Sequence, residues 1–219
     1  MSCSEVTSMV DFDTAKLLGV IGSIMVIVGY ILPIFAVVGL ILIGLSLRYL
    51  SNTFKDASIS RYATYFLGLL ILAIIIALVS SVLIVLFMII SPIVASSGTA
   101  SLEEFVSVAL ASFMLAVILL ILLVLASSIV GFIGFYFLYK SLTRLSEVSG
   151  ERLFRLSGLA IVIGYVALIF GLLTAIILVG FLLIIGGAIA FLVGFILLAV
   201  AFYSIRPPQA QPLSTSVTT

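Results

Sequence analysis

Few side chains in this sequence could do chemistry, and the residue types that are missing restrict what that chemistry could be. The chain contains no histidine and a single cysteine, Cys3. Without histidine neither a Ser-His nor a Cys-His nucleophilic pair can form, and one cysteine supplies neither a zinc cluster nor an intrachain disulfide. The sequence has no Gly-rich phosphate-binding loop of the G-x-x-x-x-G-K type. We therefore predict no catalytic residue, no metal site and no cofactor, and expect that the protein is not an enzyme.

The polar side chains inside the apolar parts of the chain are hydroxyls rather than charges. Serine and threonine on membrane helices usually donate to their own backbone or to a neighbouring helix, so we expect structural roles for them. Because these parts contain no charged residue, transport coupled to ions through a protein carboxylate is disfavoured. The residues concerned are Ser80, Ser81, Ser107, Ser112, Ser127, Ser128, Thr174, Tyr30 and Tyr165.

Two polar segments, 51–61 and 140–155, carry most of the charged residues. Opposite charges in them could form an ion-pair network or a docking surface for a soluble partner. Alternatively, the segments are solvated connectors whose polar side chains cap the adjoining helices, which is the interpretation that the composition favours. The charges concerned are Asp56, Glu147 and Glu151 on one side, and Lys55, Arg144 and Arg152 on the other.

Four long uncharged blocks separate these charges, and their length predicts a membrane protein. They span residues 17–47, 62–102, 105–139 and 156–205, in a chain that is 65% apolar and 8% charged. Soluble domains carry about 25% charged residues. Each block also exceeds the roughly 20 apolar residues that cross a bilayer core of about 30 Å. We therefore predict an integral membrane protein.

Block length also predicts the number of passes. As one helix, 156–205 would run about 75 Å, so it must fold back, near Val179-Gly180. Pro33 suits the first turn of a helix, so 17–47 is interpreted as a hairpin that turns at Ile31-Leu32-Pro33; a single kinked helix is the alternative. One pass each is predicted for 62–102, ending at Pro92, and for 105–139, opened by a capping box from Ser101 to Glu104.

The predicted fold is therefore an all-α, polytopic integral membrane protein, a six-helix bundle made of three hairpins. An N-terminal segment, 1–14, precedes the transmembrane domain 15–205, and a Pro- and Ser/Thr-rich tail, 206–219, is expected to be disordered. The predicted helices are 15–31, 33–50, 60–91, 102–140, 153–177 and 181–205.

This path places every basic residue on one side of the membrane. Basic residues in short loops are retained in the cytoplasm, so both termini are predicted to be cytoplasmic in a multipass protein of the cell membrane. Spread over short loops, these charges form no basic patch for nucleic acid, and we expect roles in topology, protein docking or contact with membrane lipid. They are Lys16, Arg48, Lys55, Arg61, Lys140, Arg144, Arg152, Arg155 and Arg206.

Small residues recur at helical spacing in the last two predicted helices. Because lipid supplies little hydrophobic drive between helices, close backbone approach at small residues holds membrane helices together. These stripes pack either within the chain or against a partner protein or a second copy. They comprise Ser157, Ala160, Gly164, Ala167, Gly171 and Thr174 on 153–177, and Gly186, Ala190 and Gly194 on 181–205.

The first and last hairpins also resemble each other in sequence. Residues 26–35 align without gaps on 161–170 and share Gly-Tyr and Ile-Phe, while 38–42 resembles 193–197. Under the six-pass path the two hairpins would have the same orientation, which is the arrangement of a parallel repeat.

Several stretches are similar to a known family. They are Ala15-Lys-Leu-Leu-Gly-Val-Ile-Gly-Ser-Ile24, then 47–59, 142–158 and 198–205. Together they resemble the prokaryotic, largely archaeal proteins catalogued as domain of unknown function 996, over 15–205, with a departure from the family's Tyr at Phe54. The resemblance implies a multipass membrane protein and no particular activity. Three classes of function remain: a non-enzymatic scaffold or subunit of a membrane complex, a carrier or pore for a neutral or apolar solute or lipid, and, least favoured, an enzyme.

Overall fold

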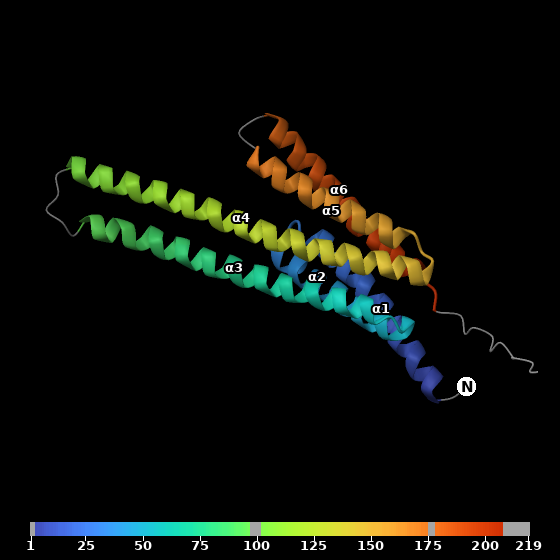
Figure 1. The fold of residues 1–219 in the computed structure, drawn as a ribbon. Coiled ribbons are helices and arrows are strands. Elements are labelled where there is room, and N and C mark those ends of the chain that lie inside the picture. The colour runs from blue at the N-terminus through green and yellow to red at the C-terminus, as the bar shows by residue number, and fades with distance from the viewer. Residues whose placement is uncertain (1–2, 97–101, 175–177, 208–219) are drawn as a thin grey trace, which may run out of the picture. The chain divides into compact units, whose positions relative to one another are not determined.

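The computed structural model describes residues 3–96, 102–174 and 178–207, and in these ranges the chain is almost entirely helical (Figure 1). Six helices confirm the predicted fold class and helix count. They are α1 (Cys3–Val28), α2 (Pro33–Phe54), α3 (Ala57–Ser96), α4 (Leu102–Ser149), α5 (Leu153–Leu173) and α6 (Leu178–Ser204). The capping residue Ser101 and the tail from 208 to 219 lie outside the described residues.

The first uncharged block is a hairpin, as predicted. α1 ends at Val28, and α2 begins at Pro33, which occupies the first helical turn where its missing N–H breaks no bond. Backbone hydrogen bonds close the turn, among them those from Tyr30 N to Ile27 O, from Ile31 N to Val28 O and from Leu32 N to Val28 O.

Several helix ends differ from the predicted ones. α1 begins at Cys3 instead of residue 15, and α4 ends at Ser149 instead of 140, because polar segments can continue a helix that the apolar pattern alone does not reveal. α3 continues past Pro92, as lipid favours keeping the remaining backbone bonds. Val179 and Gly180 belong to α6, so the last turn precedes them. Gly180 is buried, and its carbonyl lies against Gly171 of α5.

Five of the six helices, α2 to α6, are long and apolar enough to cross a membrane in their described parts. The chain is therefore a polytopic membrane protein. α3 has 40 residues and α4 has 48, which correspond to about 60 Å and 72 Å of helix. Both exceed the roughly 30 Å thickness of a bilayer core.

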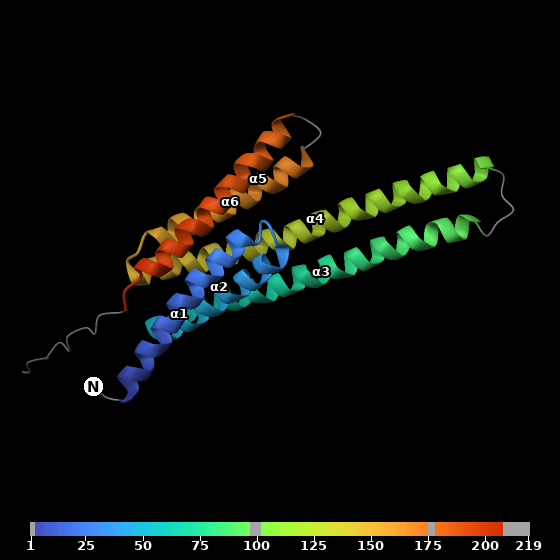
Figure 2. The same cartoon turned by 180° about the vertical axis from the view of Figure 1, so that it is seen from behind.

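The chain divides into two compact units. Unit 2, residues 68–134, contains α3 from Gly68 to its C-terminal end and α4 from its N-terminal end to Gly134. Unit 1, residues 1–67 and 135–219, contains the remaining helices and the polar ends of α3 and α4. Within unit 1 each helix contacts the next: α2 meets α3 at Gly44 and Leu67, α5 meets α4 at Gly158 and Leu142, and α6 returns to α1 (Figures 1 and 2).

Glycines set the distance between helices in both hairpins of unit 1. In the α5–α6 glycine seam (Gly164, Gly171, Gly187 and Gly194) the backbones approach so closely that a Cβ at Gly164 would lie 2.5 Å from Phe191 N. In the α1–α2 hairpin, a Cβ at Gly39 would lie 2.5 Å from Gly22 O. Close packing at small residues is thus used within the chain.

Buried polar groups join the helices of unit 1 at defined points. Ser46 Oγ on α2 donates to Ala15 O on α1 at 2.6 Å, and Ser141 Oγ on α4 donates to Ile59 O on α3 at 3.3 Å; both serines are fully buried. In unit 2, by contrast, Ser80 Oγ donates to Ile76 O of its own helix. These bonds satisfy hydroxyls that would be costly to leave unpaired in lipid.

Aromatic rings fill the centre of unit 1. Tyr165, in the middle of α5, lies 4.7 Å from Phe135 of α4 by ring centroids, and Phe135 lies 5.4 Å from Phe191 of α6. Tyr30 in the α1–α2 turn donates to Ala188 O at 3.2 Å and also meets Phe191. Offset and edge contacts of this kind add about 0.5–1.5 kcal/mol beyond the area they bury.

The likeness between residues 26–35 and 161–170 does not join equivalent positions of the two hairpins. Gly29-Tyr30 forms the turn after α1, whereas the aligned Gly164-Tyr165 lies in the middle of α5. The hairpins share the use of glycine for close packing, but a gapless alignment matches a turn with a helix centre.

The α5–α6 glycine seam makes a testable prediction about stability. Gly164→Ala should destabilise the protein by about 1–3 kcal/mol, because its methyl would collide with the backbone of α6. Gly186→Ala is the matched control: a Cβ there meets nothing within 4 Å, so the change should be neutral or stabilising. Thermal unfolding in one detergent would measure both, and equal effects at the two positions would contradict the seam.

Candidate functional site

The α2–α3 and α4–α5 turns lie at the same end of unit 1 (Figure 2), and the sequence around both turns is polar. Gly150 makes the α4–α5 turn possible, because its φ of 73° is a left-handed conformation that glycine adopts without strain. Gly150 N donates to Ser146 O at 3.0 Å, and Leu153 N donates to Glu151 Oε1 at 3.5 Å, which caps the start of α5. The turn therefore brings the end of α4 beside the start of α5.

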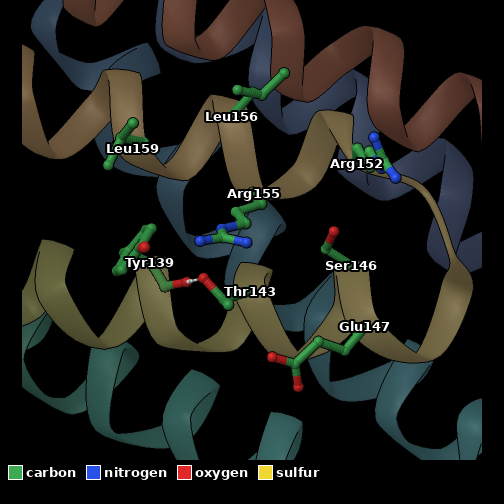
Figure 3. Close-up of a pocket in the computed structure, with 8 residues that line it drawn as sticks. All are labelled: Tyr139, Thr143, Ser146, Glu147, Arg152, Arg155, Leu156 and Leu159. Carbon is green, nitrogen blue, oxygen red and sulfur yellow. Dashed lines mark hydrogen bonds between the residues drawn. The ribbon is translucent and has the colours of Figure 1, made fainter.

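A groove of about 640 Å³ lies between these helices. Gly158 of α5 allows the two helices to approach closely beside the groove, because a Cβ there would lie 3.1 Å from the Tyr139 ring. Figure 3 shows Arg155 reaching from α5 toward Thr143 and Tyr139 of α4, while the Glu147 carboxylate turns away from α5. The residues lining this α4–α5 groove are Tyr139, Thr143, Ser146, Glu147, Arg152, Arg155, Leu156 and Leu159.

A second groove, of about 300 Å³, adjoins the first on the other side of α4. In this α3–α4 groove the Lys140 ammonium lies 5.2 Å from the Tyr136 ring centroid and 5.6 Å from that of Tyr62. Such cation–π contacts hold a cation in place without neutralising its charge. The groove is lined by Tyr62, Tyr139, Lys140, Thr143, Arg144 and Glu147. The two grooves share three residues, so together they place four cations near one carboxylate.

The other predicted basic residues lie apart from these grooves. Arg48 lines a separate groove between α2 and α3 with Asn52 and Ser60. The Lys16 ammonium lies 5.2 Å from the Tyr203 ring, and Arg61 donates to the Tyr65 hydroxyl at 3.3 Å. Arg206 follows α6 and is exposed.

The polar segments contribute helix caps. Asp56 Oδ1 accepts from Ser58 N at 2.8 Å and so caps α3. Lys55, in a left-handed conformation with φ of 54°, ends α2. Among the described residues the one ion pair joins Arg144 and Glu147 of the same helix, at 2.8 Å. These residues therefore contain no ion-pair network between the two segments.

Only some residues of the predicted small-residue stripes are buried between α5 and α6. Ser157, Gly164 and Gly171 of α5 are buried, and Gly194 of α6 packs against Ile161. Gly186 is exposed and approaches nothing, and its neighbour Gly187 takes the place against α5. Ala160, Ala167, Thr174 and Ala190 are half-buried.

Sequence reasoning missed the groove itself. Thr143, Ser146, Leu156 and Leu159 were not singled out, although Tyr139, Thr143 and Ser146 have the spacing of one helix face. Two such faces joined by a turn with glycine would have been the signal. The register that turns them toward each other depends on Gly150 and Gly158, which the polar pattern does not reveal.

Helices of this length and composition, with a basic, tyrosine-lined end, define a polytopic all-α membrane protein. The chain belongs to the family described as protein of unknown function (DUF996), whose model matches residues 35–189. It is also similar to the uncharacterized protein MJ1644 of Methanocaldococcus jannaschii, with 31% identity over 196 residues, covering 89% of this chain and 93% of the relative. No solved structure matches the chain significantly. The resemblance seen in the sequence is thus confirmed.

The Arg144–Glu147 pair should contribute little to stability. Both side chains are about half exposed, at 54% and 55%, and exposed pairs of this kind are worth about 0–1 kcal/mol. Glu147→Gln should therefore change the free energy of unfolding by less than about 1 kcal/mol. Phe154→Ala, which removes a buried ring packed 5.2 Å from Phe202, should cost about 3–5 kcal/mol in the same unfolding measurement. A comparable loss from both changes would contradict this prediction.

Proposed function

We propose that this protein is a non-enzymatic scaffold or subunit of a membrane complex, which binds a partner membrane protein or further copies of itself through helix faces in the bilayer. The observation that carries this proposal is the exposure of α3 and α4. In the apolar part of α2, 44% of residues are buried within the chain, against 6% in α3 and 0% in α4. The two longest helices are thus the least covered.

Because these helices are long, part of their exposed apolar surface extends beyond the bilayer core, which is unfavourable. Lipid covers an apolar face at no penalty over about 30 Å, but about 60 Å of α3 exceeds this thickness. The surplus must tilt, thicken the bilayer or be covered by another protein. Exposed side chains such as Leu78 and Val82 on α3, and Leu110 and Leu122 on α4, would form the covered surface.

Two helical glycines support close approach by another helix. A Cβ at Gly68 of α3 or at Gly186 of α6 would meet nothing within 4 Å of the chain. Glycine inside a helix costs about 1 kcal/mol relative to alanine, and neither position recovers this cost in packing within the chain. Small residues on open faces are the type of surface at which membrane helices associate.

For orientation, we propose that the basic end of unit 1 faces the cytoplasm, together with both termini. All nine Lys and Arg residues support this under the six-pass path, because basic residues in short loops are retained there.

Cysteine labelling tests the orientation. In a Cys3→Ser background, Lys55→Cys and Glu147→Cys should react with a membrane-impermeant maleimide only in inverted vesicles. Mass-tag shifts on gels would report each reaction. Labelling of Lys55→Cys in intact cells would reverse the orientation, while opposite sides for Lys55→Cys and Glu147→Cys would contradict one pass each for α3 and α4.

Photo-crosslinking tests the subunit proposal. A photoreactive amino acid at Leu78 or Leu122, both 61% exposed, should give one discrete protein adduct in native membranes. The same probe at Leu156, on α5 of unit 1, is the control and should not give that adduct. Gly68→Leu should abolish the adduct without lowering the thermal unfolding temperature in detergent. Lipid adducts alone at positions 78 and 122 would overturn the proposal and direct attention to a carrier.

A further inference from the structure

The α4–α5 groove contains cations that the chain itself does not neutralise. Arg152 and Arg155 line it, and neither forms an ion pair with any residue that the structure describes. The carboxylate of Glu147, also in the groove, pairs with Arg144 of its own helix. Glu151, the nearest acid along the chain, accepts from the backbone N–H of Leu153. The local charge is therefore positive, and it lies between two helices.

Hydroxyl groups line the α4 side of the same groove. Arg155 reaches toward Thr143 and Tyr139, and the Ser146 side chain points toward α5 (Figure 3). The Thr143 hydroxyl donates to Tyr139 O at 2.9 Å, so it offers a lone pair, whereas Ser146 can turn its proton to an acceptor. A guanidinium with the Ser146 hydroxyl as a further donor beside it matches the several acceptor oxygens of a phosphate.

The groove also crosses the boundary between polar and apolar sequence. The uncharged block 105–139 ends at Tyr139, and the block 156–205 begins at Leu156, so both boundaries fall within one groove. Leu156 and Leu159 line it and are 53% and 45% exposed. A ligand that fills this groove would therefore meet both guanidinium groups and aliphatic side chains.

We infer that the α4–α5 groove binds the phosphate of an anionic membrane lipid. Arg152 and Arg155 contact the phosphate oxygens, Ser146 donates a hydrogen bond, and Leu156 and Leu159 contact the first methylenes of a lipid chain. Basic pockets between membrane helices are typical sites for anionic headgroups. The two leucines favour a lipid over free phosphate, because free phosphate has no apolar part that could contact them. This inference does not depend on the proposed partner of α3 and α4.

Native mass spectrometry of the delipidated full chain would test the site. Phosphatidylglycerol should bind with a saturable stoichiometry, and phosphatidylcholine should not. Arg152→Gln with Arg155→Gln should weaken phosphatidylglycerol binding at least about tenfold, because charge-assisted hydrogen bonds are lost. Arg155→Lys keeps the charge but loses the paired donors, so it should fall between this double variant and the wild type.

Two control variants separate a site from general attraction to positive charge. Arg48→Gln, in the α2–α3 groove, and Arg61→Gln, whose guanidinium donates to the Tyr65 hydroxyl, should leave binding within about twofold of wild type. Unfolding temperatures close to that of wild type would show that each variant folds. Equal losses in the controls and the double variant would overturn the inference.

Inorganic phosphate distinguishes the source of the anion. Millimolar phosphate should not displace phosphatidylglycerol, and Leu159→Ser should weaken lipid binding without affecting phosphate. Displacement by phosphate together with no effect of Leu159→Ser would show that the groove takes a soluble anion, and would overturn the lipid assignment.

Discussion

Close backbone contact at glycine is the interaction on which the rest of this structure depends. In lipid, burying apolar side chains between helices gains little over leaving them in contact with acyl chains, so unit 1 needs another source of cohesion. The seams at Gly22 and Gly39, and at Gly164 and Gly187, supply dispersion contacts between backbones that any side chain would separate. Once these distances are fixed, buried serines and the ring cluster around Phe135 can reach their partners.

The same packing creates the polar end. Gly158 lets α5 approach Tyr139 of α4, and Gly150 lets the chain turn between the two helices. The position of the groove therefore depends on two glycines and not on its charged residues. The cations then find different surroundings: Lys140 lies against two tyrosine rings, Arg144 is paired, and Arg155 remains open to a ligand. Charges that look alike in the sequence are thus made chemically different by their neighbours.

The fold could be predicted from the sequence because uncharged length is a strong physical signal. The block 156–205 is too long for one pass, and Pro33 marks a helix start, which gave six helices. The helix ends were less predictable: the polar part of α4 after Lys140 is helical, and α3 runs past Pro92. The grooves could not be predicted, since the residues that line them depend on how α5 is oriented about its own axis. Helical spacing places Gly186 as well as Gly194 on a stripe, and only packing shows that Gly187 faces α5.

The two units differ in how their helices are held and in how much apolar surface they expose. Unit 1 contains the glycine seams, the buried interhelical hydroxyl bonds and the charged end, which are the features that fix a bundle and its orientation. In the part of unit 2 that the structure describes, the Ser80 and Ser81 hydroxyls bond to their own helix, and many apolar side chains are exposed. A surface without internal partners adapts to whatever covers it at little cost. For this reason we propose protein association for α3 and α4, and the specific lipid site for unit 1, where side chains are already held in place.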